Sequence, residues 1–144
     1  MIKIGFIGLG KLGLDCAEVF AEHYEVRGYD IYPRESDLVK VCGIEETVQE
    51  SDWIFIAVPT PHCEGYDGST PCSHLDPKDF GHEEVKIALN YVNTYARSSK
   101  KVVLISTALP GSTRRHFVPQ LDSQHQFLYN PYLEKCSATK MFFK

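Results

Sequence analysis

Three glycines near the amino terminus have the spacing of a phosphate-binding turn. Gly8, Gly10 and Gly13 form the pattern G-x-G-x-x-G, which follows an apolar run and opens a predicted helix. In that setting the first glycine permits a tight turn, the second lets a pyrophosphate approach the backbone, and the third lets the helix pack against the strand. Free N–H groups at the start of the helix attract the phosphates. The spacing therefore predicts a dinucleotide site that includes Lys11 and Leu12.

An acidic residue stands where this pattern requires one. Asp30 follows the next predicted strand, in the region about 20 residues on where the acid of a dinucleotide fingerprint is found. Its carboxylate can accept hydrogen bonds from the adenine ribose and repels a 2′-phosphate, which favours NAD over NADP. Arg34 is an opposing signal, because a nearby arginine can hold a 2′-phosphate. The alternative for the whole motif is a glycine-rich turn that binds no ligand.

Small and polar residues stand at the ends of two further predicted strands. Val58, Pro59 and Thr60 end or follow the apolar run WIFIAV, and Ser106 and Thr107 follow the run VVLI. Ligands of open parallel sheets bind outside the carboxyl ends of the strands. These five residues are therefore expected in the second half of the cofactor site. The alternative is ordinary turn chemistry at strand ends.

The elements that would position these residues alternate between strand and helix. Short apolar runs predict strands, and apolar residues spaced three and four apart predict helices. Strands are expected at residues 2–7, 25–29, 53–58, 102–105 and 127–129. Helices are expected at residues 11–22, 35–42, 45–50 and 83–96, with another capped by Ser112 or Thr113. This order predicts an α/β fold of the Rossmann type, doubly wound, with a mainly parallel sheet and helices on both faces.

A long loop at residues 59–79 separates two of these elements, and loops of that length are often functional. It contains His62, Cys63, Cys72 and His74, which are residue types that bind zinc. Their spacing is irregular, so we predict that the segment from His62 to His74 holds no metal. Asp79, at the end of the loop, is expected to belong to the turn that leads into the next helix.

Composition and charge narrow the class of protein. The chain has 144 residues and a net charge of −4, which suits a single domain over residues 1–144 and lacks the basic footprint of a nucleic-acid binder. The sequence contains no apolar run of the roughly 20 residues that a membrane span needs. Five cysteines without a regular pattern indicate reduced thiols and a cytoplasmic protein.

Four ordered motifs together resemble one enzyme family. Residues 4–13 (IGFIGLGKLG) with Asp30, then Pro59-Thr60-Pro61, residues 106–113 (STALPGST) and Asn130-Pro131 are similar to the N-terminal half of the UDP-glucose/GDP-mannose dehydrogenases. The glycine motif alone would equally suit the 3-hydroxyisobutyrate or 6-phosphogluconate dehydrogenases. Tyr132 stands where the family has a glutamate, and Glu134 lies two residues on.

The resemblance implies an NAD-binding domain of an oxidoreductase in nucleotide-sugar metabolism and polysaccharide biosynthesis. The family oxidises a primary alcohol of a nucleotide sugar to a carboxylate with NAD, and Thr107 matches a threonine near its nicotinamide and a catalytic water. The family's catalytic cysteine, lysine and aspartate lie in a later segment that this chain does not reach. Expected partners are therefore a nucleotide-sugar substrate, a separate catalytic domain or second chain, or a second copy of this chain. The alternative is a non-catalytic NAD-binding or regulatory module.

Overall fold

Six parallel strands form one sheet in the computed structural model, which describes residues 1–71 and 73–131. The strands are β1 (Lys3–Ile7), β2 (Glu25–Tyr29), β3 (Lys40–Val41), β4 (Trp53–Ile56), β5 (Lys101–Leu104) and β6 (Gln126–Tyr129). Their spatial order is β3-β2-β1-β4-β5-β6, and every adjacent pair is parallel. The chain reverses its direction of travel across the sheet between β1 and β4, which is the switch point where ligands of doubly wound sheets bind.

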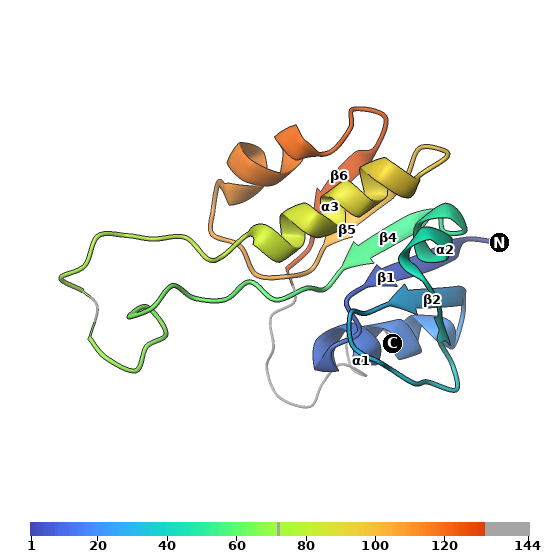
Figure 1. Ribbon diagram of the computed structural model, residues 1–144, viewed down its shortest axis with the longest axis horizontal. Coiled ribbons are helices and arrows are strands. Elements are labelled where there is room, and N and C mark those ends of the chain that lie inside the picture. Colours follow the sequence, from blue (N-terminus) through green and yellow to red (C-terminus); the bar gives the residue numbers. More distant parts are fainter. Residues whose placement is uncertain (72, 132–144) are drawn as a thin grey trace.

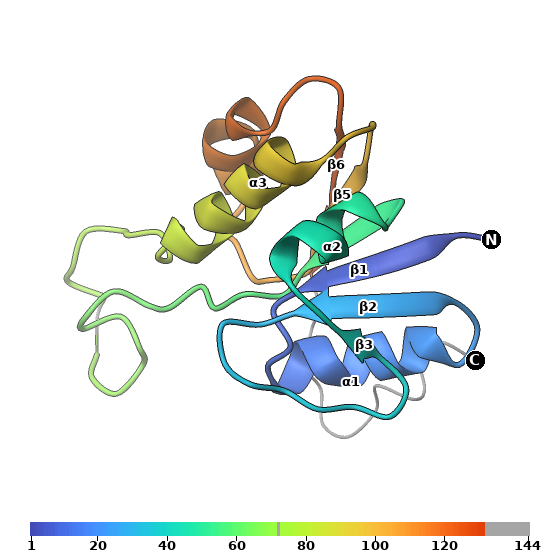
Figure 2. The same ribbon diagram turned by 45° about the vertical axis from the view of Figure 1, so that its right-hand side comes forward.

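Helices cover both faces of this sheet. The helix α1 (Lys11–Ala21) lies on one face, and α2 (Ile44–Gln49) and α3 (Glu83–Tyr95) lie on the other (Figures 1 and 2). Each face has its own apolar core, one gathered around Phe6 and Ala17 and the other around Ile54 and Leu89. The predicted Rossmann-type α/β fold is confirmed.

The helices form where the apolar spacing predicted them. In α3 the residues Val85, Ala88, Leu89 and Val92 are buried in one stripe, with the spacing i, i+3, i+4, i+7. In α1 the thiol of Cys16 is buried as a small core group. No helix in the described part of the chain is long and apolar enough to cross a membrane.

The prediction of a helix over residues 35–42 is wrong. This segment is irregular, with bends at residues 37–39, and leads into β3, which pairs with β2. Ser36 Oγ accepts the N–H groups of Leu38 and Val39, each at 3.2 Å, so its side chain forms a local turn in place of helical hydrogen bonds. Val39 is buried on the α1 side of the sheet.

The predicted helix capped by Ser112 or Thr113 is also wrong in form. Residues Thr113–Phe117 form a wide π-type turn and Val118–Gln120 a 3₁₀ turn, with no side-chain cap. Ser112 Oγ instead donates a hydrogen bond to Asp79 Oδ2, from the long loop. The cause is a tertiary contact: the Ser112 hydroxyl, which a helix cap would use, is bonded to Asp79, a residue distant in sequence.

The segment between β4 and α3 is the predicted long loop. It leaves the carboxyl edge of the sheet and extends to the left in Figure 1 before returning to the start of α3. Pro59 and Thr60 at its start line the first site described below, and Asp79 at its returning end belongs to the second.

Candidate dinucleotide site

A cavity of about 620 Å³ opens at the carboxyl edge of the sheet, at the switch point between β1 and β4. Its lining comes from the glycine turn, the ends of β2, β4 and β5, and one side of α3. The twelve residues predicted from the sequence to bind the cofactor all line this cavity. They are Gly8, Gly10, Lys11, Leu12, Gly13, Asp30, Arg34, Val58, Pro59, Thr60, Ser106 and Thr107.

Two of the glycines are required by the packing of the turn. Gly8 has a φ of 98°, and a Cβ there would lie 2.5 Å from the carbonyl oxygen of Ala57. A Cβ on Gly13 would lie 2.1 Å from the carbonyl oxygen of Gly8, because α1 crosses directly over the turn. Any side chain at either position would push the turn away from β4.

The third glycine, Gly10, has a different role. A Cβ there would meet no atom within 4 Å, so the position faces open space in the cavity. Gly10 is the N-cap of α1 and provides no side-chain cap, and the first N–H groups of a helix have no acceptor within it. The positive end of an eleven-residue helix therefore faces the cavity. This arrangement fits the phosphates of a dinucleotide.

Asp30 is held firmly at the rim of the cavity. Its Oδ2 accepts the N–H of Leu9 at 2.7 Å, and its Oδ1 accepts the N–H of Tyr32 at 2.8 Å. The Nε of Arg34 lies 3.7 Å from the same Oδ2. Each carboxylate oxygen has a second lone pair, so the group can still accept a hydrogen bond from a ribose hydroxyl. The charge of Arg34 is partly balanced by Asp30.

Hydrogen bonds fix the ends of the strands on the far side of the cavity. Ser106 Oγ donates to the carbonyl of Val58 at 2.6 Å and so joins the ends of β5 and β4. The hydroxyl of Tyr129 accepts the N–H of Ala108 at 2.9 Å and donates to its carbonyl at 3.1 Å. Thr107 lies between these two attachments, exposed and lining the cavity.

Sequence reasoning missed an apolar wall of the cavity. Tyr29 and Tyr91 meet edge to face, with ring centroids 6.2 Å apart, and Ile87 is half exposed beside them. Burial, then the neighbouring Tyr91, raises the pKa of Tyr29, so its hydroxyl stays neutral. The signal lay in α3, where Glu84, Ile87 and Tyr91 have helical spacing beside the core stripe. The remaining lining residues that were missed are Ile31, Tyr32, Ala57, Ala88, Ile7 and Ile105.

The zinc-type residues of the long loop do not meet within the part of the structure that is described. His62 packs against the ring of Phe80, and Cys63 Sγ lies 3.4 Å from the carbonyl oxygen of Asp79. Cys72 lies outside the described residues, as do Tyr132 and Glu134. Over residues 1–71 and 73–131, one group of three metal-ligating side chains has its ligand atoms within 4.8 Å of one another, and it is Asp79, His82 and His116.

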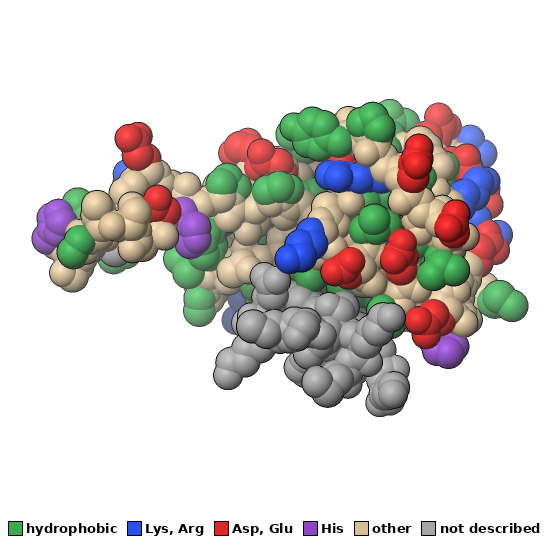
Figure 3. All heavy atoms as spheres, turned by 90° about the horizontal axis from the view of Figure 1, so that it is seen from below, with side chains coloured by type: hydrophobic (Ala, Val, Ile, Leu, Met, Phe, Trp, Pro, Cys, Tyr) green, Lys and Arg blue, Asp and Glu red, His purple; other side chains and the backbone are tan. Residues whose placement is uncertain are grey.

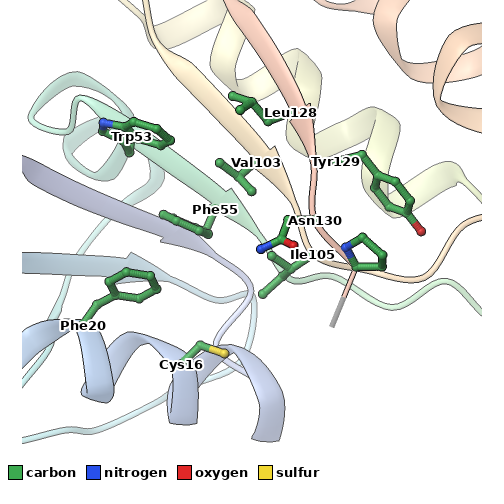
Figure 4. A pocket seen from close by; sticks show the side chains of 10 residues that line it. Cys16, Phe20, Trp53, Phe55, Val103, Ile105, Leu128, Tyr129 and Asn130 are labelled. Carbon is green, nitrogen blue, oxygen red and sulfur yellow. The ribbon is translucent and has the colours of Figure 1, made fainter. Parts of the chain in front are cut away.

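A second cavity of about 350 Å³ lies on the α1 face of the sheet, over β4, β5 and β6. Figure 4 shows Cys16 and Phe20 on α1, Phe55 and Trp53 along β4, and Val103 and Leu128 on the neighbouring strands. The lining is mainly apolar and offers no pair of groups that could exchange a proton. On the molecular face seen in Figure 3, acidic and basic side chains are interspersed over the body of the domain.

Comparisons with known proteins show which proteins this chain is similar to. No protein-family model matches the sequence. The chain is 29% identical to a UDP-N-acetyl-D-mannosamine dehydrogenase from Methanococcus maripaludis, over 78% of this chain and 30% of that protein. It is 36% identical to a Bacillus subtilis protein named as a 6-phosphogluconate dehydrogenase, over 40% of this chain and 20% of that protein.

The fold is shared with a solved structure of GDP-mannose dehydrogenase from Pseudomonas aeruginosa. The TM-score is 0.76 at 20% identity, covering 95% of this chain and 38% of that one. The chain thus spans about a third of the length of these relatives. The resemblance to the N-terminal part of nucleotide-sugar dehydrogenases is confirmed.

Proposed function

We propose, from this relationship to the nucleotide-sugar dehydrogenases, that the chain is the NAD-binding part of an enzyme that oxidises the primary alcohol of a UDP-sugar to a carboxylate. One observation carries the proposal. The twelve residues chosen from sequence motifs alone line a single cavity at the switch point of the sheet. NAD, when bound, accepts the hydride, while this chain supplies position and electrostatics.

Different residues of the cavity would bind different parts of the cofactor. The open Gly10 and the start of α1 would receive the pyrophosphate, and Asp30 would accept the ribose hydroxyls. The exposed side chains of Ile31 and Tyr32 would flank the adenine at the rim. The ends of β4 and β5, with Thr107, would then hold the nicotinamide end. Apolar walls with a few placed polar groups are typical of cofactor sites.

The charges at the rim favour NAD over NADP. A 2′-phosphate would approach the Asp30 carboxylate, and the nearby cation Arg34 already pairs with that carboxylate at 3.7 Å. We expect NAD to bind at least tenfold more tightly than NADP, a difference of about 1.4 kcal/mol. Isothermal titration of the chain with each cofactor measures this ratio. Equal affinities for NAD and NADP would overturn the selection of NAD by Asp30 and would indicate that Arg34 holds the 2′-phosphate.

Turnover is expected to need groups outside this chain. Oxidation to a carboxylate requires an activated nucleophile and a sugar held against the nicotinamide, and the resemblance places those groups in a later segment. We therefore expect NAD binding without steady NADH formation when the chain is mixed with UDP-glucose, UDP-galactose or GDP-mannose. The absorbance of NADH at high protein concentration tests this. Steady formation that is lost on replacing one of the five cysteines would show that the active site is complete here.

A second candidate is the NAD domain of a 6-phosphogluconate-type dehydrogenase. It is favoured by the 36% identity over 59 residues to the Bacillus subtilis protein. Titration of the NAD-loaded chain with UDP and with 6-phosphogluconate separates the two candidates. A binding heat with 6-phosphogluconate and none with UDP would favour the second candidate.

A further inference from the structure

We propose that Asp79, His82 and His116 form a binding site for a divalent transition metal of the zinc class. The three residues come from the returning end of the long loop, the N-cap of α3 and the turn after β5. None of them lines the dinucleotide cavity. Two imidazoles and one carboxylate are a ligand set that zinc accepts, with the fourth position left for water or another ligand.

The first observation is the distance between two of the ligand atoms. His82 Nε2 lies 3.3 Å from Asp79 Oδ2. Zinc bonds of about 2.0–2.1 Å in a tetrahedron separate neighbouring ligand atoms by about 3.3 Å. The rings of His82 and His116 are tilted by 44° with centroids 5.1 Å apart, so they are not stacked flat against each other. The spacing of His82 and Asp79 therefore suits a shared ion, and the ligand atoms of all three residues lie within 4.8 Å of one another.

The second observation is that His82 Nε2 has no hydrogen bond. The side chain is only 9% exposed, the nitrogen is buried, and despite its closeness to Asp79 the two atoms are not aligned as donor and acceptor. A buried ring nitrogen that lies 3.3 Å from a carboxylate oxygen without a well-aligned hydrogen bond is incompletely satisfied, which is costly. A metal ion bound to this nitrogen would remove that cost. This is a feature that the surface histidines of the chain do not share.

The surroundings of Asp79 hold its carboxylate in place. Ser112 Oγ donates a hydrogen bond to Oδ2, and the N–H of Phe80 donates to Oδ1 at 2.8 Å. Outer hydrogen bonds of this kind orient metal ligands. The positive end of the α3 dipole disfavours a cation, but Glu83 and Glu84 in the first turn offset it.

A metal here would join the end of the long loop and the start of α3 to the turn after β5. His82 stands two residues before Glu84, and His116 follows the strand end that carries Ser106 and Thr107, so both walls of the dinucleotide cavity adjoin the site. Bound metal would then fix the end of the long loop against the domain. The inference does not depend on which dinucleotide or sugar the chain binds.

The test is titration of the whole, chelator-treated chain with Zn²⁺ by isothermal calorimetry, followed by Co²⁺ as a spectroscopic probe. We expect one ion per chain and a melting temperature that rises with zinc concentration. His116→Gln and Asp79→Asn should each weaken zinc binding at least about a hundredfold, and Ser112→Ala about tenfold through lost orientation. His116 is half exposed, so its variant should fold even if a change at His82 does not.

Matched variants separate this site from the long loop. His23→Gln, at an exposed histidine, and the double change Cys63→Ser with Cys72→Ser should bind zinc as the parent chain does. The cobalt spectrum should show tetrahedral bands without a thiolate charge-transfer band. Unchanged zinc affinity in both His116→Gln and Asp79→Asn, a thiolate band, or no bound zinc in the parent chain would each overturn the proposal.

Discussion

The carboxylate of Asp30 accepts the backbone N–H of Leu9 at 2.7 Å. One oxygen thereby joins the end of β2 to the middle of the glycine turn, and the other accepts the N–H of Tyr32. The acid that the sequence motif assigns to ribose recognition is thus also part of the structure of the phosphate turn. Changes at Asp30 should affect both parts of the site.

Replacement of this acid should alter cofactor choice. In Asp30→Asn we expect NAD to bind at least about tenfold more weakly, because the charged acceptor is lost and charge-assisted hydrogen bonds are the stronger ones. The preference over NADP should shrink, because Arg34 loses its counter-charge. Asp52→Asn is the matched control, since Asp52 Oδ2 accepts the N–H of Lys3 at 2.9 Å in the exposed start of β1. If both variants lose NAD equally, general destabilisation is the cause.

The open position of Gly10 should be specific to ligand binding. Gly10→Val places a side chain where the phosphates are expected, so NAD affinity should fall at least about tenfold. Gly43 is a close match, because it is the N-cap of α2 with similar φ (−68° against −64°), and its Cβ would also meet nothing within 4 Å. Both valine variants should lose no more than about 1 kcal/mol of unfolding free energy. Full NAD affinity in Gly10→Val would contradict the placement of the pyrophosphate.

Cys16 should resist alkylation in the folded chain. Burial, with a smaller effect of Asp15, raises the pKa of its thiol to about 11, so the reactive thiolate is scarce at neutral pH. Iodoacetamide at pH 8 should label Cys63, which is half-buried at the start of the long loop, before Cys16. Mass spectrometry of the digested protein gives the order. Labelling of Cys16 in urea is the positive control, and early labelling in the native chain would contradict its burial.

Stability should fall in mild acid because of His125. Burial lowers the pKa of this side chain from 6.5, Asp122 opposes the shift and Lys100 adds to it. The unfolded chain then binds the proton more readily, so the unfolding free energy decreases as the pH falls below about 6.5 and through the lower folded pKa. Denaturant unfolding from about pH 7 to pH 5 measures the slope.

Two variants test whether His125 causes this loss of stability in mild acid. His125 Nδ1 accepts the N–H of Lys100 at 3.0 Å, so His125→Ala should lose about 1–3 kcal/mol at pH 7. His125→Asn retains an acceptor and should flatten the acid slope at smaller cost. The exposed residue in His23→Asn serves as control, and an unchanged slope in His125→Asn would refute the assignment.

The sequence by itself determined five of the six strands, the helices α1, α2 and α3, the two-faced parallel sheet and the twelve residues at its carboxyl edge. These follow from local signals, because apolar runs, helical spacing and glycine turns each specify their own backbone. The register of the glycine motif to β1 and α1 is local as well, since a Cβ on Gly13 would lie 2.1 Å from the carbonyl oxygen of Gly8, five residues away.

Tertiary structure alone decided the features that depend on partners distant in sequence. Lys40 and Val41 form an edge strand because β2 offers free backbone groups, and the Ser112 hydroxyl bonds to Asp79, 33 residues away, and does not cap a helix. The same fold brought Asp79 and His82 to His116, across β5, although the loop's own histidines and cysteines had the more conspicuous pattern. The spacing of residues along the chain does not predict such contacts, because they depend on how the packed sheet places loop ends that are distant in sequence.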